Sequence, residues 1–128
     1  MSAGNIGFFE VRVDDFQRAQ KFYRDVFGWE FSKSDGVPYE FYMIDNSKKG
    51  EMGLQEGGMR KREKPLVTNS GESGYVCYIM VEAIDEALEK IAKHGGIVTT
   101  PKAYIPAGYF AYALDTEGNA FGVWEVAH

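Results

Sequence analysis

The chain has 128 residues, which is enough for one domain with a sizeable core or for two half-domains. Its composition, 45% hydrophobic and 15% aromatic, is typical of a packed globule and excludes a disordered chain. The formal net charge of −5 disfavours phosphate backbones and anionic lipid surfaces, so we expect no nucleic-acid or membrane partner. The sequence shows no leader-like segment, and its single cysteine, Cys77, suits a reducing compartment, so we expect a cytoplasmic protein.

An internal repeat is found when residues 6–57 are laid on residues 74–126 with an offset of 68, which rises to 69 near the end. The matching pairs are Val13 and Val81, Ala19 and Ala87, Gly28 and Gly96, Gly53 and Gly122, and Glu56 and Glu125. The repeat predicts two modules within a single domain, at about 6–57 and 74–127, joined by a polar linker at 58–73.

Each module is expected to begin with a strand and a helix. The runs at 8–13 and 76–81 are rich in β-branched and aromatic residues, which favour strands. Apolar residues then recur at helical spacing over 19–27 and 84–92. Three strand-like runs follow in each module, at 29–34, 39–44 and 51–56 and at 97–100, 108–114 and 120–126. The sequence therefore predicts an α+β fold in which two βαβββ modules form a curled mixed sheet around a cavity.

Strand alternation indicates which side chains face that cavity. In the first strand the apolar set Phe9, Val11 and Val13 should meet the helix, which turns the other set to the cavity. By this argument the strands that open the modules contribute Phe8, Glu10, Arg12, Val76, Tyr78 and Met80. Through the repeat, the closing strands contribute Met52, Leu54, Glu56, Phe121, Val123 and Glu125.

Two groups of residues have both a functional and a structural interpretation. Pro106 and Gly108 predict a bend that places Tyr104 and Tyr109 over the mouth of the cavity, where they could stack on a planar or cationic ligand, although strand packing also explains such aromatics. The basic residues of the predicted linker suit either an anion site or a solvated loop; they are Arg60, Lys61, Arg62 and Lys64.

The sequence resembles the glyoxalase/bleomycin-resistance/dioxygenase superfamily, also called vicinal oxygen chelate proteins. The resemblance rests on VDDFQRAQKFYRDVFGW at 13–29, VEAIDEALEKIAKHGGIV at 81–98 and DTEGNAFGVWE at 115–125, and it covers nearly the whole chain. It implies the glyoxalase-like fold. It does not imply one activity, since members include lyases, epimerases, dioxygenases, thiol transferases and metal-free drug-binding proteins.

The resemblance also implies where a metal would bind. The carboxylate ligands of metal-using relatives match Glu56 and Glu125, but their histidine ligands match Phe8 and Val76. The only histidines of the chain are His94, expected at a helix end, and the last residue, His128. Zinc, nickel and iron prefer ligand sets that mix nitrogen with oxygen or sulfur, so we expect none of these metals. Binding of a hard divalent cation by the two glutamates remains an alternative.

Three functional hypotheses follow. The first is a glyoxalase-like protein that binds a small organic molecule in an aromatic, carboxylate-bearing cavity without the usual metal or another cofactor. The second is a lyase or isomerase, related to lactoylglutathione lyase, that uses Glu56 and Glu125 as an acid/base pair or as ligands of a hard cation. The third is a non-catalytic module whose cavity is filled by Phe8, Tyr78 and Met80. In each case we expect a homodimer.

Overall fold

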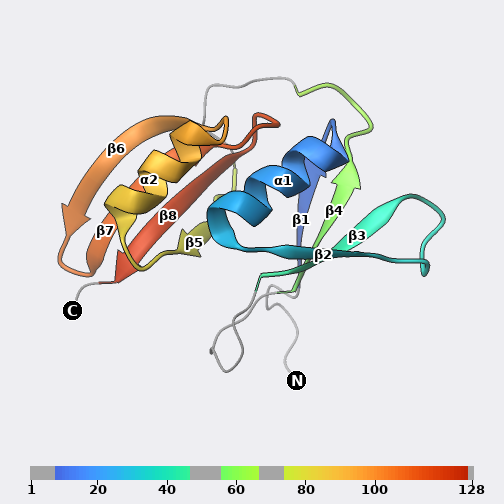
Figure 1. Cartoon of the computed structure of the whole chain (residues 1–128), viewed down its shortest axis with the longest axis horizontal. Coiled ribbons are helices and arrows are strands. Elements are labelled where there is room, and N and C mark those ends of the chain that lie inside the picture. The colour runs from blue at the N-terminus through green and yellow to red at the C-terminus, as the bar shows by residue number, and fades with distance from the viewer. Residues whose placement is uncertain (1–7, 47–55, 67–73, 127–128) are drawn as a thin grey trace. The chain divides into compact units, whose positions relative to one another are not determined.

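The computed structural model describes residues 8–46, 56–66 and 74–126 of the chain, which runs from blue to red in Figure 1. The chain divides into two compact units, residues 1–63 and 64–128, and each unit is described by itself. The first unit contains the run expected as the first module at 6–57, and the second contains the run expected as the second module at 74–127. Each contains one helix and a four-stranded mixed sheet, which confirms the βαβββ order and the α+β class.

The first module consists of β1 (Phe9–Val13), α1 (Phe16–Phe27), β2 (Glu30–Lys33), β3 (Phe41–Asp45) and β4 (Gly57–Lys61). Its strands are ordered β1-β4-β3-β2, with β1 and β4 parallel and the other pairs antiparallel. Asp15 caps α1 by accepting a hydrogen bond from the Arg18 N–H at 3.0 Å. Gly28 ends the helix with φ 76°, a left-handed conformation that suits glycine.

The core of the first module lies between α1 and its sheet. Ala19, Phe22 and Tyr23 form the buried side of the helix, as the helical spacing predicted. The sheet face that packs against this helix is also buried, since Val13 and Met59 are fully inaccessible to solvent. An aromatic contact joins the two layers, since Phe16 of α1 lies 4.9 Å from Tyr42 of β3 between ring centroids. Tyr23 stacks at 4.5 Å on Trp29, which lies between α1 and β2.

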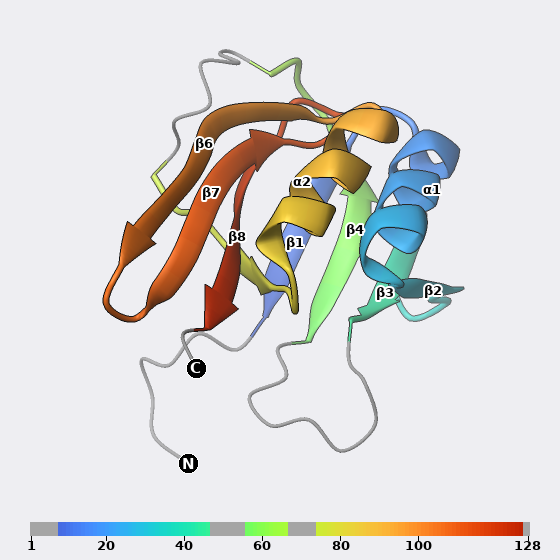
Figure 2. The ribbon, with the colours of Figure 1, turned by 60° about the vertical axis from the view of Figure 1, so that its left-hand side comes forward.

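The second module consists of β5 (Tyr78–Met80), α2 (Ile84–Lys93), β6 (Ile97–Ile105), β7 (Gly108–Leu114) and β8 (Ala120–Val126). Its strands are ordered β5-β8-β7-β6, again with one parallel pair, β5 and β8. Figure 2 shows β6 and β7 running side by side as long, bent strands. Their register shifts twice between Val98 and Ala103, and such irregularities bend a strand.

The turn between β7 and β8 is held by one buried carboxylate. Asp115 is 3% exposed, and its Oδ1 accepts hydrogen bonds from the N–H groups of Glu117 and Asn119, both at 2.8 Å. Its Oδ2 accepts a third from the Asn119 side chain at 3.1 Å. Gly118, at φ 82°, completes the turn with a conformation that suits glycine.

The last strand of the first module is not where the repeat placed it. The run expected as a strand at 51–56 lies, except for Glu56, outside the described residues, and β4 occupies Gly57–Lys61, of which residues 58–61 belong to the predicted linker. Gly58 pairs with Glu10 just as Gly122 pairs with Tyr78, so Gly58 is the counterpart of Gly122. Glu56 therefore precedes the strand and is not the counterpart of Glu125.

Among the described residues, the two helices have 12 and 10 residues, and neither has the length to cross a bilayer.

Candidate functional site

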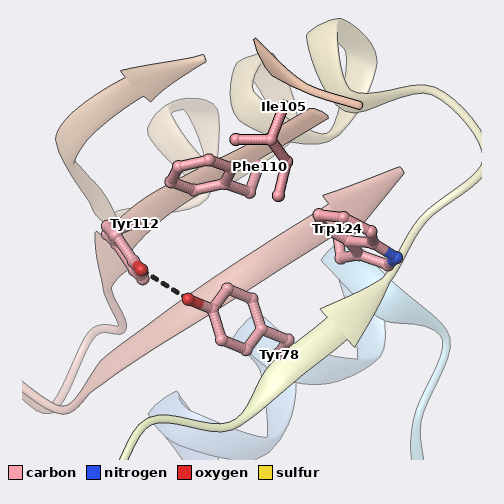
Figure 3. Close-up of a pocket in the computed structure, with 5 residues that line it drawn as sticks. All are labelled: Tyr78, Ile105, Phe110, Tyr112 and Trp124. Carbon is pink, nitrogen blue, oxygen red and sulfur yellow. Dashed lines mark hydrogen bonds between the residues drawn. The ribbon is translucent and has the colours of Figure 1, made fainter. Parts of the chain in front are cut away.

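The second module has a pocket on the sheet face opposite α2. Five side chains from all four strands line this pocket, which we call the aromatic pocket: Tyr78, Ile105, Phe110, Tyr112 and Trp124. Its volume is about 450 Å³, within the range typical of sites for small organic molecules. Figure 3 shows these side chains gathered over the strands that carry them.

Strand pairing explains why these side chains share one face. Tyr78 and Tyr112 both lie opposite Gly122, and Phe110 lies opposite Trp124, so the four large rings project from the same side of the sheet. A Cβ on Gly122 would lie 2.6 Å from Cδ1 of Tyr78. The absence of a side chain at Gly122 is thus what allows the Tyr78 ring to lie over β8.

The polar groups of the aromatic pocket discussed here are two uncharged tyrosine hydroxyl groups. The Tyr78 and Tyr112 hydroxyl groups hydrogen-bond to one another, as the dashed line in Figure 3 marks, and their rings lie 5.8 Å apart. This hydrogen bond to Tyr112, aided by partial desolvation, raises the pKa of Tyr78 above its ordinary value. Among the described residues that line it there is no carboxylate, so the expected carboxylate-bearing character is not found in this part of the structure. These five side chains can stack on a ligand and hydrogen-bond to it, but they include no pair of carboxylates for acid/base chemistry.

The face of β8 was predicted wrongly. Val123 is fully buried, and the Glu125 Oε1 accepts a hydrogen bond at 2.8 Å from the Ile84 N–H, the first backbone group of α2. Phe121, Val123 and Glu125 alternate with the pocket residue Trp124 and therefore belong to the helix side. Because β8 is apolar on both faces, alternation alone could not show which face meets the helix. Glu125 acts as the cap that Ala83 does not supply.

Tyr104 and Tyr109 also lie on the helix side. They face each other across β6 and β7 at 5.2 Å between ring centroids. Lys102 lies over the Tyr109 ring at 4.9 Å and pairs with Asp85 of α2 at 3.2 Å. The bend at Pro106 and Gly108 exists, since it joins β6 to β7, but it does not carry these two rings to the aromatic pocket.

The predicted site residues of the first module that the structure describes lie on or next to the sheet of that module. Phe8, Glu10 and Arg12 lie on the face opposite α1, as alternation predicted: Phe8 stacks on Phe41 at 6.4 Å, and Arg12 forms an ion pair with Glu10. Glu56 is exposed, and its backbone carbonyl accepts the Phe9 N–H at 3.1 Å. Leu54 and Met52 lie outside the described residues.

In the second module, Tyr78 is the one predicted site residue that lines the aromatic pocket. Val76 precedes β5, and Met80 is 69% exposed on the same strand. The sequence does not identify Ile105 and Trp124 as lining residues. The position of Trp124 next to Glu125 in β8 could have identified it as a lining residue. Because neighbouring strand residues point to opposite faces, Trp124 must face away from α2 if Glu125 faces α2.

The donor set does not fit the metal centre that the resemblance implies. Phe8 and Val76 carry no ligand atom, and the Glu125 carboxylate is engaged by the start of α2. Within residues 8–46, 56–66 and 74–126, no three His, Cys, Asp or Glu side chains are grouped so that they could hold a metal ion.

Comparison with known proteins gives the family. The model of the Glyoxalase/Bleomycin resistance protein/Dioxygenase superfamily matches residues 5–123. The chain belongs to this superfamily. A glyoxylase-like domain-containing protein from Didymella fabae is 30% identical over 125 residues, which cover 94% of this chain and 92% of that protein. The chain spans about half the length (46%) of two further relatives, from Mycobacterium bovis and Mycobacterium tuberculosis, each 24% identical to it.

Solved structures show the same fold at low identity. A glyoxylase/bleomycin resistance protein/dioxygenase domain from Frankia sp. EAN1pec is 17% identical with a TM-score of 0.73, covering 98% of this chain and all of that one (100%). TnmS3, an antibiotic binding protein from Streptomyces sp. CB03234, is 18% identical with a TM-score of 0.66, covering 99% of both chains. These likenesses establish the glyoxalase-like architecture.

Proposed function

We propose that this superfamily member binds a flat, mainly apolar organic molecule in the aromatic pocket, without a histidine-ligated transition metal. The observation that carries the proposal is the pocket itself: about 450 Å³, lined by four aromatic rings and one isoleucine. Rings of this kind favour stacked or edge-on contact with another planar system. A flat ligand would therefore gain more from this pocket than a puckered ligand of equal size.

The two tyrosine hydroxyls add a polar recognition element. Since they hydrogen-bond to one another, one O–H remains to donate, and lone pairs of both oxygens remain to accept. A ligand with one hydroxyl or carbonyl group at its edge can join this pair. TnmS3, whose fold this chain shares, is described as an antibiotic binding protein, which supports a binding role for the architecture.

The two other hypotheses receive less support. The lyase or isomerase hypothesis needs Glu56 and Glu125 as a pair, but Glu125 binds the first N–H of α2 and Glu56 precedes β4. The filled-cavity hypothesis requires Tyr78 to plug the space, yet Tyr78 is 49% exposed beside an open pocket. A binding protein is the function that the lining chemistry supports best.

A pair of matched ligands tests the proposal. We expect 2-naphthol to bind saturably and its saturated analogue, decahydro-2-naphthol, to bind at least about tenfold more weakly, which corresponds to about 1.4 kcal/mol. Trp124→Ala should abolish the preference for the flat ligand. Tyr104→Ala removes an exposed ring from the opposite face and is the control, expected to leave both affinities unchanged. Equal affinity for the two ligands in the unaltered protein would contradict stacking as the basis of binding.

A further inference from the structure

A second cavity, of about 340 Å³, lies in the first module where β4 ends and α1 begins. We call it the charged pocket, because five of its described lining residues carry a formal charge; the lining is Phe16, Tyr39, Glu40, Arg60, Lys61, Arg62 and Glu63. Three consecutive cations thus border one cavity in a chain whose formal net charge is −5. These cations are part of the run that suited either an anion site or a solvated loop.

Arg60 is held in place by an aromatic ring. Its guanidinium carbon lies 3.8 Å from the centroid of the Tyr39 ring, a cation–π contact. Its Nη2 also lies 2.6 Å from Glu63 Oε1, but the Glu63 side chain is 65% exposed whereas that of Arg60 is 22% exposed. Exposed ion pairs are weak, so an incoming anion can replace Glu63 while Tyr39 keeps the guanidinium in position.

Lys61 and Arg62 have different roles. Arg62 is structural: its side chain is 8% exposed, it pairs with Asp14 at 2.7 Å, and it donates to the Arg12 carbonyl at 3.2 Å. Lys61 is exposed, and within the described part of the chain its ammonium group has no hydrogen-bond or ion-pair partner. The charged pocket is therefore lined by a lysine without a partner in the described part of the chain and by an arginine whose guanidinium is fixed on Tyr39.

The remaining lining sets the size and charge of the ligand. Phe16 and the half-exposed Tyr39 supply apolar walls, and Phe16 is itself held against Tyr42. Glu40 accepts a hydrogen bond from the Tyr42 hydroxyl at 2.6 Å and, with Glu63, opposes a second negative charge. We propose that the charged pocket binds a small aromatic monocarboxylate, with its carboxylate on Arg60 and Lys61 and its ring against Tyr39 and Phe16.

Benzoate, with benzamide as its neutral isostere, tests this proposal on the full ¹⁵N-labelled chain at low ionic strength. We expect saturable shifts of the backbone amides of residues 39–42 and 60–63 with benzoate. Benzamide should bind about tenfold more weakly, because charge-assisted hydrogen bonds are lost. Added salt should weaken the binding of benzoate and not that of benzamide.

Two lysine variants make the test specific. Lys61→Gln changes an exposed side chain and should remove the preference for benzoate, with the amide spectrum otherwise preserved. Lys64→Gln alters the same basic run outside the pocket lining and should keep the preference. The proposal is overturned by an equal response to the two ligands, by no saturable shift at millimolar benzoate, by shifts confined to the surroundings of Trp124, or by an unchanged Lys61→Gln variant.

Discussion

Replacing Gly122 with alanine tests whether a missing side chain builds the aromatic pocket. Gly122 does not adopt positive φ, so its backbone accepts alanine without strain. The new Cβ would lie 2.6 Å and 2.7 Å from two carbons of the Tyr78 ring, far closer than van der Waals contact allows. The ring must therefore move, and the hydrogen bond between Tyr78 and Tyr112 must break or lengthen.

The cost in stability should be small and the cost in binding large. Overpacking a tight core costs about 1–3 kcal/mol, but Tyr78 is 49% exposed and can turn outward. Glycine-to-alanine replacement also reduces the entropy of the unfolded chain, which offsets about 0.4–1 kcal/mol. We expect the free energy of unfolding to change by less than about 1 kcal/mol, whereas the affinity for 2-naphthol falls more than about tenfold.

Urea denaturation and ligand titration of four proteins complete the experiment: the parent, Gly122→Ala, Tyr78→Ala and the double variant. In the Tyr78→Ala background there is no ring to displace, so Gly122→Ala should have no further effect on affinity. Gly58→Ala is the matched control, since a Cβ there would overlap the ring of Phe41, which is only 7% exposed and cannot turn away. It should cost about 2 kcal/mol or more. Additive losses of affinity in the double variant would refute the reasoning.

Three further predictions concern single side chains. Glu125→Ala should lower the free energy of unfolding by about 1 kcal/mol, because the Ile84 N–H loses its cap, and should leave ligand affinity unchanged; lost affinity at unchanged stability would instead favour the acid/base hypothesis. Asp115→Ala should cost about 2–3 kcal/mol in urea denaturation, because three donors of the β7–β8 turn lose their acceptor. Because the pKa of Tyr78 is raised, the folded state keeps the proton of this hydroxyl group to a higher pH than the unfolded chain does. The hydrogen bond that raises the pKa therefore stabilises the fold below a pH of about 10, and this stabilisation is lost as the pH rises through the folded pKa. Absorbance titration of tyrosinate should show this late ionisation, and Tyr112→Phe should remove it.

The helices and most strands could be predicted because their patterns are local. Apolar spacing located both helices, and alternation placed Phe9 and Val13 on the helix side of β1. β4 was missed because Gly57 and Gly58 lie within a polar, basic run, which is typical of a loop. The structure explains both glycines: a Cβ at either position would overlap an aromatic ring, Phe9 for Gly57 and Phe41 for Gly58. Such glycines carry no sequence signal of a strand, because their role depends on residues far away in the chain.

The candidate site was predicted in part for a related reason. The side of the sheet on which Tyr78 lies could be predicted, because β5 follows the pattern of β1. For β8, which has apolar residues on both faces, only the repeat indicated which face lies away from the helix. That alignment matched Glu56 to Glu125 and so suggested a symmetric pair of carboxylates. Strand pairing matches Gly58 to Gly122 instead, and the two modules differ in the chemistry of their pockets: one is aromatic, and the other is charged.

The central claim, metal-independent binding of a flat molecule in the aromatic pocket, can be tested through the two tryptophans. Their indole N–H groups give separate NMR signals, and Trp29 is buried in the first module whereas Trp124 lines the aromatic pocket. In a titration with 2-naphthol in excess EDTA, the Trp124 indole signal is predicted to shift saturably while the Trp29 signal stays in place. A Trp124 signal that does not move, or that moves only when a transition metal is supplied, would contradict the account.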